Sequence, residues 1–257
     1  MSNSCPLATT SSCFKQIMAT PDFHFKRCSI QQQGAAHPVG TDAILLGAWT
    51  NIGNALRILD IGTGTGVVAL MLAQRTENHE HVQIDAVEIH QGSAACAARN
   101  FAASPWNKRL HVVELSIQEF AQQTDLQYDL IVSNPPYFSE TTKAPDPTRR
   151  LGRHIESLPP QDMLRAVRKL LAPNGRFSVI LPVKEGWKWC ELAVPLGLCW
   201  TRITEVYGRK EKPAERLIIE FQRNPYPFQR ESLTIYKQGL EYNEEYEALT
   251  REFYLRG

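Results

Sequence analysis

The chain has 257 residues, 43% of them hydrophobic and 21% charged, and its 28 basic and 27 acidic residues give a formal net charge of +1. This composition is typical of one globular enzyme-sized domain and argues against a binding peptide or a fibre. Because the total charge is close to zero, a nucleic-acid surface can be argued only from the local distribution of charge.

The N-terminal region is predicted to be a flexible tail over residues 1–22, followed by a single domain over residues 23–257. It is rich in Ser and Thr, and residues 1–20 contain neither the arginines of a transit peptide nor the apolar core of a secretory signal. No apolar run reaches the roughly 18 residues of a membrane span. We therefore expect a cytoplasmic protein.

The cysteines and histidines predict no metal site. His79 and His81 lie in a polar turn without a third ligand. The cysteines show no paired spacing that would bind zinc, which favours reduced thiols; they are Cys5, Cys13, Cys28, Cys96, Cys190 and Cys199.

The first predicted helix covers residues 43–49, directly after Thr41 and Asp42. Two roles stay open for this polar pair. The side chains can cap the helix, or they can line a ligand pocket beside the loop that follows.

A glycine-rich loop follows the predicted strand Arg57–Ile61 and opens a helix over residues 66–74. Gly62 and Gly64 allow the backbone to bend close to a ligand, and Gly66 allows the helix to pack closely on the sheet. The dinucleotide fingerprint has its third glycine three positions after the second, whereas here the interval is two, so a pyrophosphate site is disfavoured.

Asp60, at the end of that strand, would repel a pyrophosphate but could receive a cationic amino acid group. S-adenosylmethionine carries such a group and NAD does not. The expected donor site comprises Asp60, Gly62, Thr63, Gly64 and Gly66.

A second strand, residues 82–88, ends in Glu88. An acid about 20 residues after such a loop, at the carboxyl end of a parallel strand, can accept both ribose hydroxyls of a nucleoside. The alternative is a solvated carboxylate that caps the next helix near His90.

The later elements alternate as strand and helix, which predicts a parallel sheet covered on both faces. Expected helices cover Gln91–Ala103, residues 161–171 and residues 185–196. Expected strands cover Leu110–Glu114, Tyr128–Ser133 and residues 176–181, with residues 198–207 and Arg216–Gln222 as a closing antiparallel pair.

The stretch Asn134, Pro135, Pro136 and Tyr137 ends the strand Tyr128–Ser133. The prolines restrict the backbone to a stiff turn. The Asn134 side-chain oxygen and the Pro135 carbonyl are neutral acceptors, and Tyr137 offers a flat face. Two acceptors and a ring can hold a planar amine, although an ordinary strand-ending turn is the alternative.

These three motifs together resemble the Rossmann-like methyltransferases that use S-adenosylmethionine to modify planar amino groups. Further segments resemble the bacterial adenine-N6 methyltransferases that modify the nucleoside at position 37 of a valine tRNA; these segments are residues 37–49, residues 104–106 and residues 253–255. The resemblance covers the chain from about residue 23 to its end.

The resemblance implies a mostly parallel seven-stranded sheet with helices on both faces and methyl transfer to the N6 amine of adenine 37 in tRNA. Asn134, Pro135, Pro136 and Tyr137 are then the catalytic residues, and Asn134 also borders the donor. In related enzymes an acid after the third strand reaches the donor's adenine. Here Ser116 stands in its place, so the Ile117 backbone would take over that contact, while Thr41 would line the same site.

Contact with tRNA is predicted for Tyr137 and Phe138, which would stack on a base turned out of the RNA. Two basic clusters would bind phosphates, although an incidentally charged, solvated loop is the alternative. The clusters are Lys143, Arg149, Arg150 and Arg153, and then Arg209, Lys210, Lys212 and Arg216.

Two other functions stay open. A protein-glutamine N5-methyltransferase could use the same corner, but those enzymes have a helical domain before the glycine loop, and the 59 residues ahead of Asp60 do not resemble one. A non-catalytic RNA-binding module could retain the fold. The sequence leaves the exact tRNA and the oligomeric state open, and a monomer is compatible with it.

Overall fold

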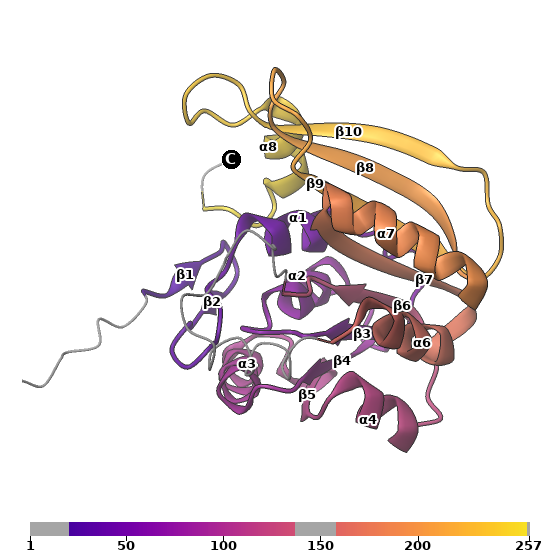
Figure 1. Cartoon of the computed structure of the whole chain (residues 1–257). Helices are drawn as coiled ribbons and strands as arrows, with labels where there is room; N and C mark the ends of the chain where they lie inside the picture. Colours follow the sequence, from indigo (N-terminus) through magenta and orange to yellow (C-terminus); the bar gives the residue numbers. More distant parts are fainter. Residues whose placement is uncertain (1–20, 137–157, 256–257) are drawn as a thin grey trace, which may run out of the picture.

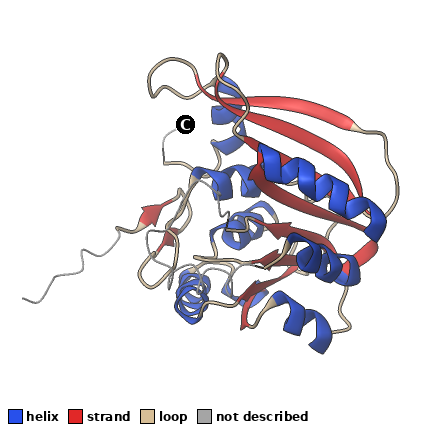
Figure 2. Cartoon of the chain, viewed as in Figure 1, coloured by secondary structure: helices blue, strands red, loops and turns tan. Residues whose placement is uncertain are grey.

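The computed structural model describes residues 21–136 and 158–255. Its centre is an eight-stranded sheet in the order β10-β8-β9-β7-β6-β3-β4-β5. Figure 1 shows the strands crossing the molecule, with helices on both sides, and Figure 2 marks the same layers by type. The strands are β3 (Arg57–Ile61), β4 (Gln83–Glu88), β5 (Leu110–Glu114), β6 (Tyr128–Ser133), β7 (Leu171–Pro182), β8 (Cys199–Arg209), β9 (Arg216–Gln222) and β10 (Gln229–Tyr236).

The helices are α1 (Thr41–Trp49), α2 (Val67–Arg75), α3 (Gln91–Ala103), α4 (Ile117–Gln123), α6 (Pro160–Leu170), α7 (Val183–Ala193) and α8 (Glu244–Thr250). Single 3₁₀ turns, η1 (Asn107–Arg109) and η2 (Val194–Leu196), follow α3 and α7. The mixed α/β architecture predicted from the sequence is confirmed.

The strands β5, β4, β3, β6 and β7 run parallel to their neighbours, and β9 is antiparallel to both β7 and β8. The closing antiparallel pair is therefore correct. The predicted count of seven strands is wrong, because β10 adds an eighth strand parallel to β8. Its first four residues are exposed and only Leu233 and Ile235 are buried, which leaves too short an apolar pattern to be noticed.

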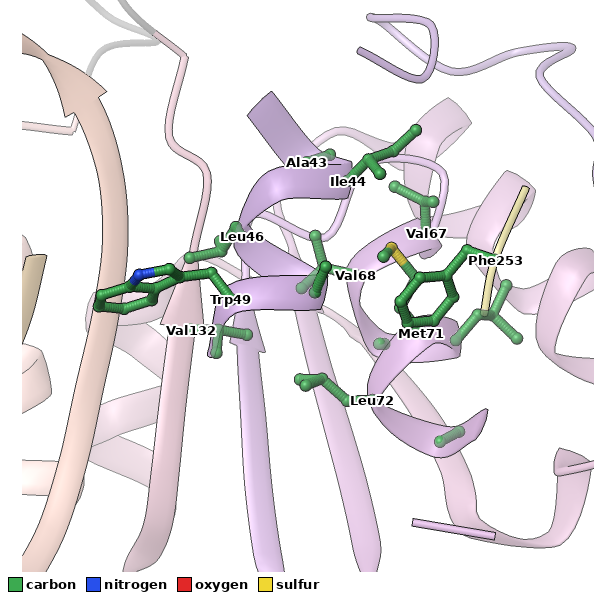
Figure 3. Packing of buried hydrophobic residues seen from close by; sticks show 14 of the residues in the cluster. Ala43, Ile44, Leu46, Trp49, Val67, Val68, Met71, Leu72, Val132 and Phe253 are labelled. Carbon is green, nitrogen blue, oxygen red and sulfur yellow. The ribbon is translucent and has the colours of Figure 1, made fainter. Parts of the chain in front are cut away.

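Two apolar clusters fill the two faces of the sheet. Alternation along β3 divides them, since Ile58 belongs to the cluster beneath α1 and α2 and Leu59 to the cluster beneath α6 and α7. Figure 3 shows the first cluster, where Met71 of α2 lies beside Phe253 from the end of the chain. By the same alternation, Asp60 points to the face of Ile58.

Several boundaries differ from the prediction. The helix expected from residue 66 begins at Val67, because Gly66 has a φ of 82°. Strand β7 begins at Leu171 and includes the expected loop, with a register irregularity opposite β6. The helix expected over residues 185–196 is divided into α7 and η2, and the short helices α4 and α8 were not predicted.

The first and last described segments lie side by side. A two-stranded sheet, β1 (Phe23–His24) with β2 (Ser29–Ile30), precedes α1. Phe25 bridges to Tyr254, and the Lys26 amide donates to the Phe253 carbonyl over 2.8 Å (Figure 1). The tail predicted over residues 1–22 falls, apart from its last two residues, outside the described part of the chain.

Among the described residues, none of the helices has the length and apolar character needed to cross a membrane. In the same ranges, 21–136 and 158–255, no three His, Cys, Asp or Glu side chains gather where they could hold a metal ion.

Candidate functional site

The glycine loop stands at the carboxyl end of β3, in the middle of the sheet. Gly62, Gly64 and Gly66 have φ values of 69°, 57° and 82°, in the left-handed region that favours glycine. A Cβ atom on either of the first two would meet nothing within 4 Å, whereas one on Gly66 would lie 2.5 Å from Cε1 of Phe101. The first two glycines therefore border open space.

The expected role of Gly66 in close packing against the sheet needs correction. Its close neighbour is Phe101, which belongs to α3 and not to a strand. The absence of a side chain at this position lets α3 pack against the start of α2.

Asp60 lies beneath the glycine loop with only 1% of its surface exposed. Its Oδ2 accepts a hydrogen bond of 2.6 Å from the Thr63 hydroxyl. Burial raises the pKa of this carboxyl to about 7, and the nearby charge of Glu88 raises it further, while the Thr63 hydrogen bond opposes both. A cation bound beside Asp60 would favour the ionised form.

Glu88 ends β4 beside the same loop and is 8% exposed. Its Oε2 accepts from the Gly64 amide over 2.9 Å, and its Oε1 accepts from the His90 amide over 2.9 Å. The carboxylate thus holds the glycine loop and the turn before α3 together. Each oxygen keeps acceptor capacity for a hydroxyl group.

Asn134 follows β6 directly, next to the glycine loop. The register pairs Ile61 with Ser133, and the Ser133 hydroxyl donates to the Ile61 carbonyl over 2.8 Å. Asn134 and Pro135 are half-buried, while Pro136 is exposed. The corner predicted from the sequence therefore begins beside Gly62.

Several predicted contacts fall outside the described residues. They are Tyr137, Phe138, Lys143, Arg149, Arg150 and Arg153.

Thr41 and Asp42 occupy the first turn of α1 without capping it. Gly40 is the N-cap residue, and no side chain bonds to the free amides there. Thr41 is exposed. The Asp42 carboxylate instead accepts a hydrogen bond of 2.8 Å from Nε of Arg216, so the capping alternative is wrong for this residue.

Ser116 is the N-cap residue of α4 and forms a capping box with Glu119. Its hydroxyl donates to Glu119 Oε2 over 2.6 Å, and its amide donates to the same oxygen over 3.1 Å. Ile117 begins the helix and is 4% exposed. Local helix capping therefore explains the serine, and its predicted place in the donor site stays untested.

The loop between β8 and β9 lies at the same edge of the sheet as the glycine loop, because Arg216 pairs with Pro182 at the carboxyl end of β7. The Arg209 guanidinium donates to the Gly239 carbonyl over 2.9 Å. Lys210 and Lys212 are exposed. Of this basic cluster, the two lysines present their charge to solvent, while both arginines take part in internal contacts.

The structure also shows a buried residue that the sequence analysis missed. Asn100, within the alanine-rich α3, donates from Nδ2 to the Thr65 carbonyl of the glycine loop over 2.8 Å. An asparagine in the interior of a helix is a weak signal by itself, and only the fold places it here.

Comparison with known proteins agrees with this site. A family model described as the methyltransferase small domain matches residues 39–188. A relative from Parabacteroides distasonis, named tRNA1(Val) (adenine(37)-N6)-methyltransferase, is 40% identical over 240 residues, which cover 93% of this chain and 100% of the relative. The chain belongs to this methyltransferase family.

A second family member, from Flavobacterium psychrophilum, has the same name and is 43% identical over 235 residues, covering 91% of this chain and 99% of its own. Among solved structures, this methyltransferase fold is similar to a predicted O-methyltransferase of Agrobacterium tumefaciens, with a TM-score of 0.62 and 18% identity over 82% of this chain and 96% of that one. The second likeness shows the fold alone. The resemblance inferred from the sequence is confirmed.

Proposed function

We propose that this protein transfers a methyl group from S-adenosylmethionine to the N6 amine of adenine 37 in tRNA1(Val). The names of relatives that align with 91–93% of the chain support the substrate. The observation that carries the reaction type is the position of the Asn134 corner directly beside the glycine loop, set by the pairing of β6 with β3.

The residues at the carboxyl edge fit the methyl donor. Open space at Gly62 and Gly64 leaves room for it against the backbone. The Asp60 carboxyl can receive its ammonium group, and the two oxygens of Glu88 can accept ribose hydroxyls. When bound, the donor supplies an electrophilic methyl group on a sulfonium.

The acceptor is held by hydrogen bonds from its own amine. The Asn134 side-chain oxygen and the Pro135 carbonyl would accept the two N6 hydrogens, which draws the nitrogen lone pair out of conjugation and aims it at the methyl group. Orientation of this kind can contribute about 7–11 kcal/mol. No strong base is needed, because the methylated cationic nitrogen is very acidic and loses its proton readily.

The target base has to leave the RNA stack to reach this corner. Tyr137, with Phe138, would stack on it, a contact worth roughly 1–3 kcal/mol per base. Lys210 and Lys212, exposed at the same edge of the sheet, would bind tRNA phosphates, with Arg209 beside them. The natural place for such an enzyme is the cytoplasm, where its tRNA is found.

Substitution of Asn134 tests the role assignment. In Asn134→Ala the affinity for S-adenosylmethionine should stay near the wild-type value, because Asp60, Glu88 and the glycine loop are unchanged. Methyl transfer to tRNA should fall by about 100-fold or more, as expected for losing a positioned polar group in a transition state. Equal losses of donor binding and of transfer would contradict the assignment.

The substrate is tested separately with labelled donor. The wild-type protein is incubated with RNA from a strain that lacks its gene, and the RNA is digested to nucleosides. Label in N6-methyladenosine is expected. Label in protein glutamine with unlabelled RNA would favour the glutamine methyltransferase alternative, and donor binding without any transfer would favour a non-catalytic module.

A further inference from the structure

Helix α3 holds the backbone of the segment between β2 and α1. The Ser93 hydroxyl accepts a hydrogen bond of 3.0 Å from the Ala36 amide. One helical turn later, the Cys96 thiol donates to the Gln31 carbonyl over 3.1 Å. The segment over residues 31–36 is therefore bound to one face of α3 through main-chain groups, whose bonding does not depend on the segment's own side chains.

Asn100 extends this contact to the glycine loop. It is 2% exposed, and its Oδ1 accepts from the Gln31 amide over 2.8 Å. Its Nδ2 donates both to the Gln31 carbonyl, over 2.9 Å, and to the Thr65 carbonyl, over 2.8 Å. One buried amide thus bonds two separate stretches of backbone.

The bond to Thr65 is well placed to control the glycine loop. Thr65 stands between Gly64 and Gly66, which have φ values of 57° and 82°. Glycines can adopt many other backbone conformations, so this part of the loop does not hold its shape through local preference alone. A buried carbonyl that keeps its hydrogen bond in one orientation restricts both flanking glycines.

The segment held by Asn100 continues to the rim of the site. It ends at Gly40, the N-cap residue of α1. Asp42, two residues later, pairs with Arg216, which stands opposite Pro182 at the carboxyl edge of the sheet. Residues 31–40 therefore run from α3 to the edge at which the glycine loop lies.

We infer that Asn100 is a positioning residue for donor binding. It holds the Thr65 peptide, and with it the Gly64 amide that Glu88 fixes from the other side, and it joins residues 31–40 to that loop as a flank of the donor site. This role rests on the proposed function. Asn100 acts through the loop backbone and touches neither the donor nor the RNA base.

The test compares Asn100→Leu, which keeps a similar volume but removes all three hydrogen bonds, with Cys96→Ala, which removes a contact to the same Gln31 carbonyl but none to the loop. Binding of S-adenosylmethionine is measured by calorimetry, and kcat at saturating donor is measured with tRNA. In Asn100→Leu, Kd should rise about tenfold, as expected for a buried carbonyl without its donor, while kcat stays within about twofold. Cys96→Ala should change neither value by more than about twofold.

Equal Kd values for folded Asn100→Leu and wild type would overturn the inference, as would an equal rise in Cys96→Ala. If Asn100→Leu does not fold, hydrogen exchange of the wild-type protein decides. Donor binding should then slow exchange in residues 31–36 together with residues 62–66, and protection confined to residues 62–66 would also overturn it. A wild-type protein that binds no donor would instead contradict the proposed function.

Discussion

Asp60 makes the folded protein sensitive to pH in an unusual direction. Burial is the main cause that raises the pKa of its carboxyl from 3.8 to about 7. In the unfolded chain the same group ionises near its ordinary pKa of about 3.9. The stability it contributes is therefore complete below about pH 4 and is lost as the pH rises toward 7, because the folded protein must then hold a buried charge.

The size of this effect follows from the difference between the folded and unfolded pKa of Asp60, which corresponds to about 4 kcal/mol of unfolding free energy. Asp60→Asn removes the titration and keeps an oxygen for the Thr63 hydroxyl. Without ligand, this variant should be more stable than wild type by up to about 4 kcal/mol near pH 8, and the advantage should shrink to about 1–2 kcal/mol near pH 5.

Urea unfolding followed by tryptophan fluorescence between about pH 5 and pH 8 measures this difference. The exposed Asp125 provides a matched control, and Asp125→Asn should follow the wild-type pH dependence. Unfolding free energies of wild type and Asp60→Asn that stay parallel across this range would refute the reasoning.

Further predictions concern the glycine loop and the tRNA surface. Gly66→Ala should destabilise the fold by about 3 kcal/mol or more, since it combines a left-handed backbone with a steric clash, whereas Gly62→Ala, with open space around its Cβ, should cost about 1–2 kcal/mol in urea unfolding and mainly weaken donor binding. Donor binding by wild type below about pH 7 should release a proton from Asp60, measured by calorimetry in buffers of different ionisation enthalpy, and proton-neutral binding would contradict the site. The double variant Lys210→Ala with Lys212→Ala should lower the slope of log affinity for tRNA against log salt by about 1.5–2, and an unchanged slope would show that neither lysine contacts phosphate.

Much of the fold was accessible from local pattern. The predicted bounds of β3, α3, β5, β6 and β9 agree with the structure. In β3 and β6 the apolar run is continuous, because both faces of a central parallel strand are buried. The acidic helix α8 and the short α4 were missed, since each buries only a few side chains and their patterns are too brief to indicate a helix.

The site was predicted in part for the same reason. Asp60, Glu88 and Asn134 each follow or end a recognisable strand, and parallel strands bring their carboxyl ends to one edge. Asp42 and Ser116 show the limit of this argument. Asp42 was a candidate for capping or for the donor site, and it binds Arg216, which is 174 residues away along the chain. Ser116 bonds Glu119 three residues later.

The sequence by itself determined the class of fold, the family and the strand ends at which chemistry occurs, because apolar periodicity, glycine conformation and the proline turn act over a few neighbouring residues. The tertiary structure decided which groups share a hydrogen bond across the chain. It placed β10 on β8 and Phe101 against Gly66. It also placed Asn100 between Gln31 and Thr65, at separations of 69 and 35 residues. Such contacts depend on how whole helices and strands pack, and no short stretch of sequence contains that information.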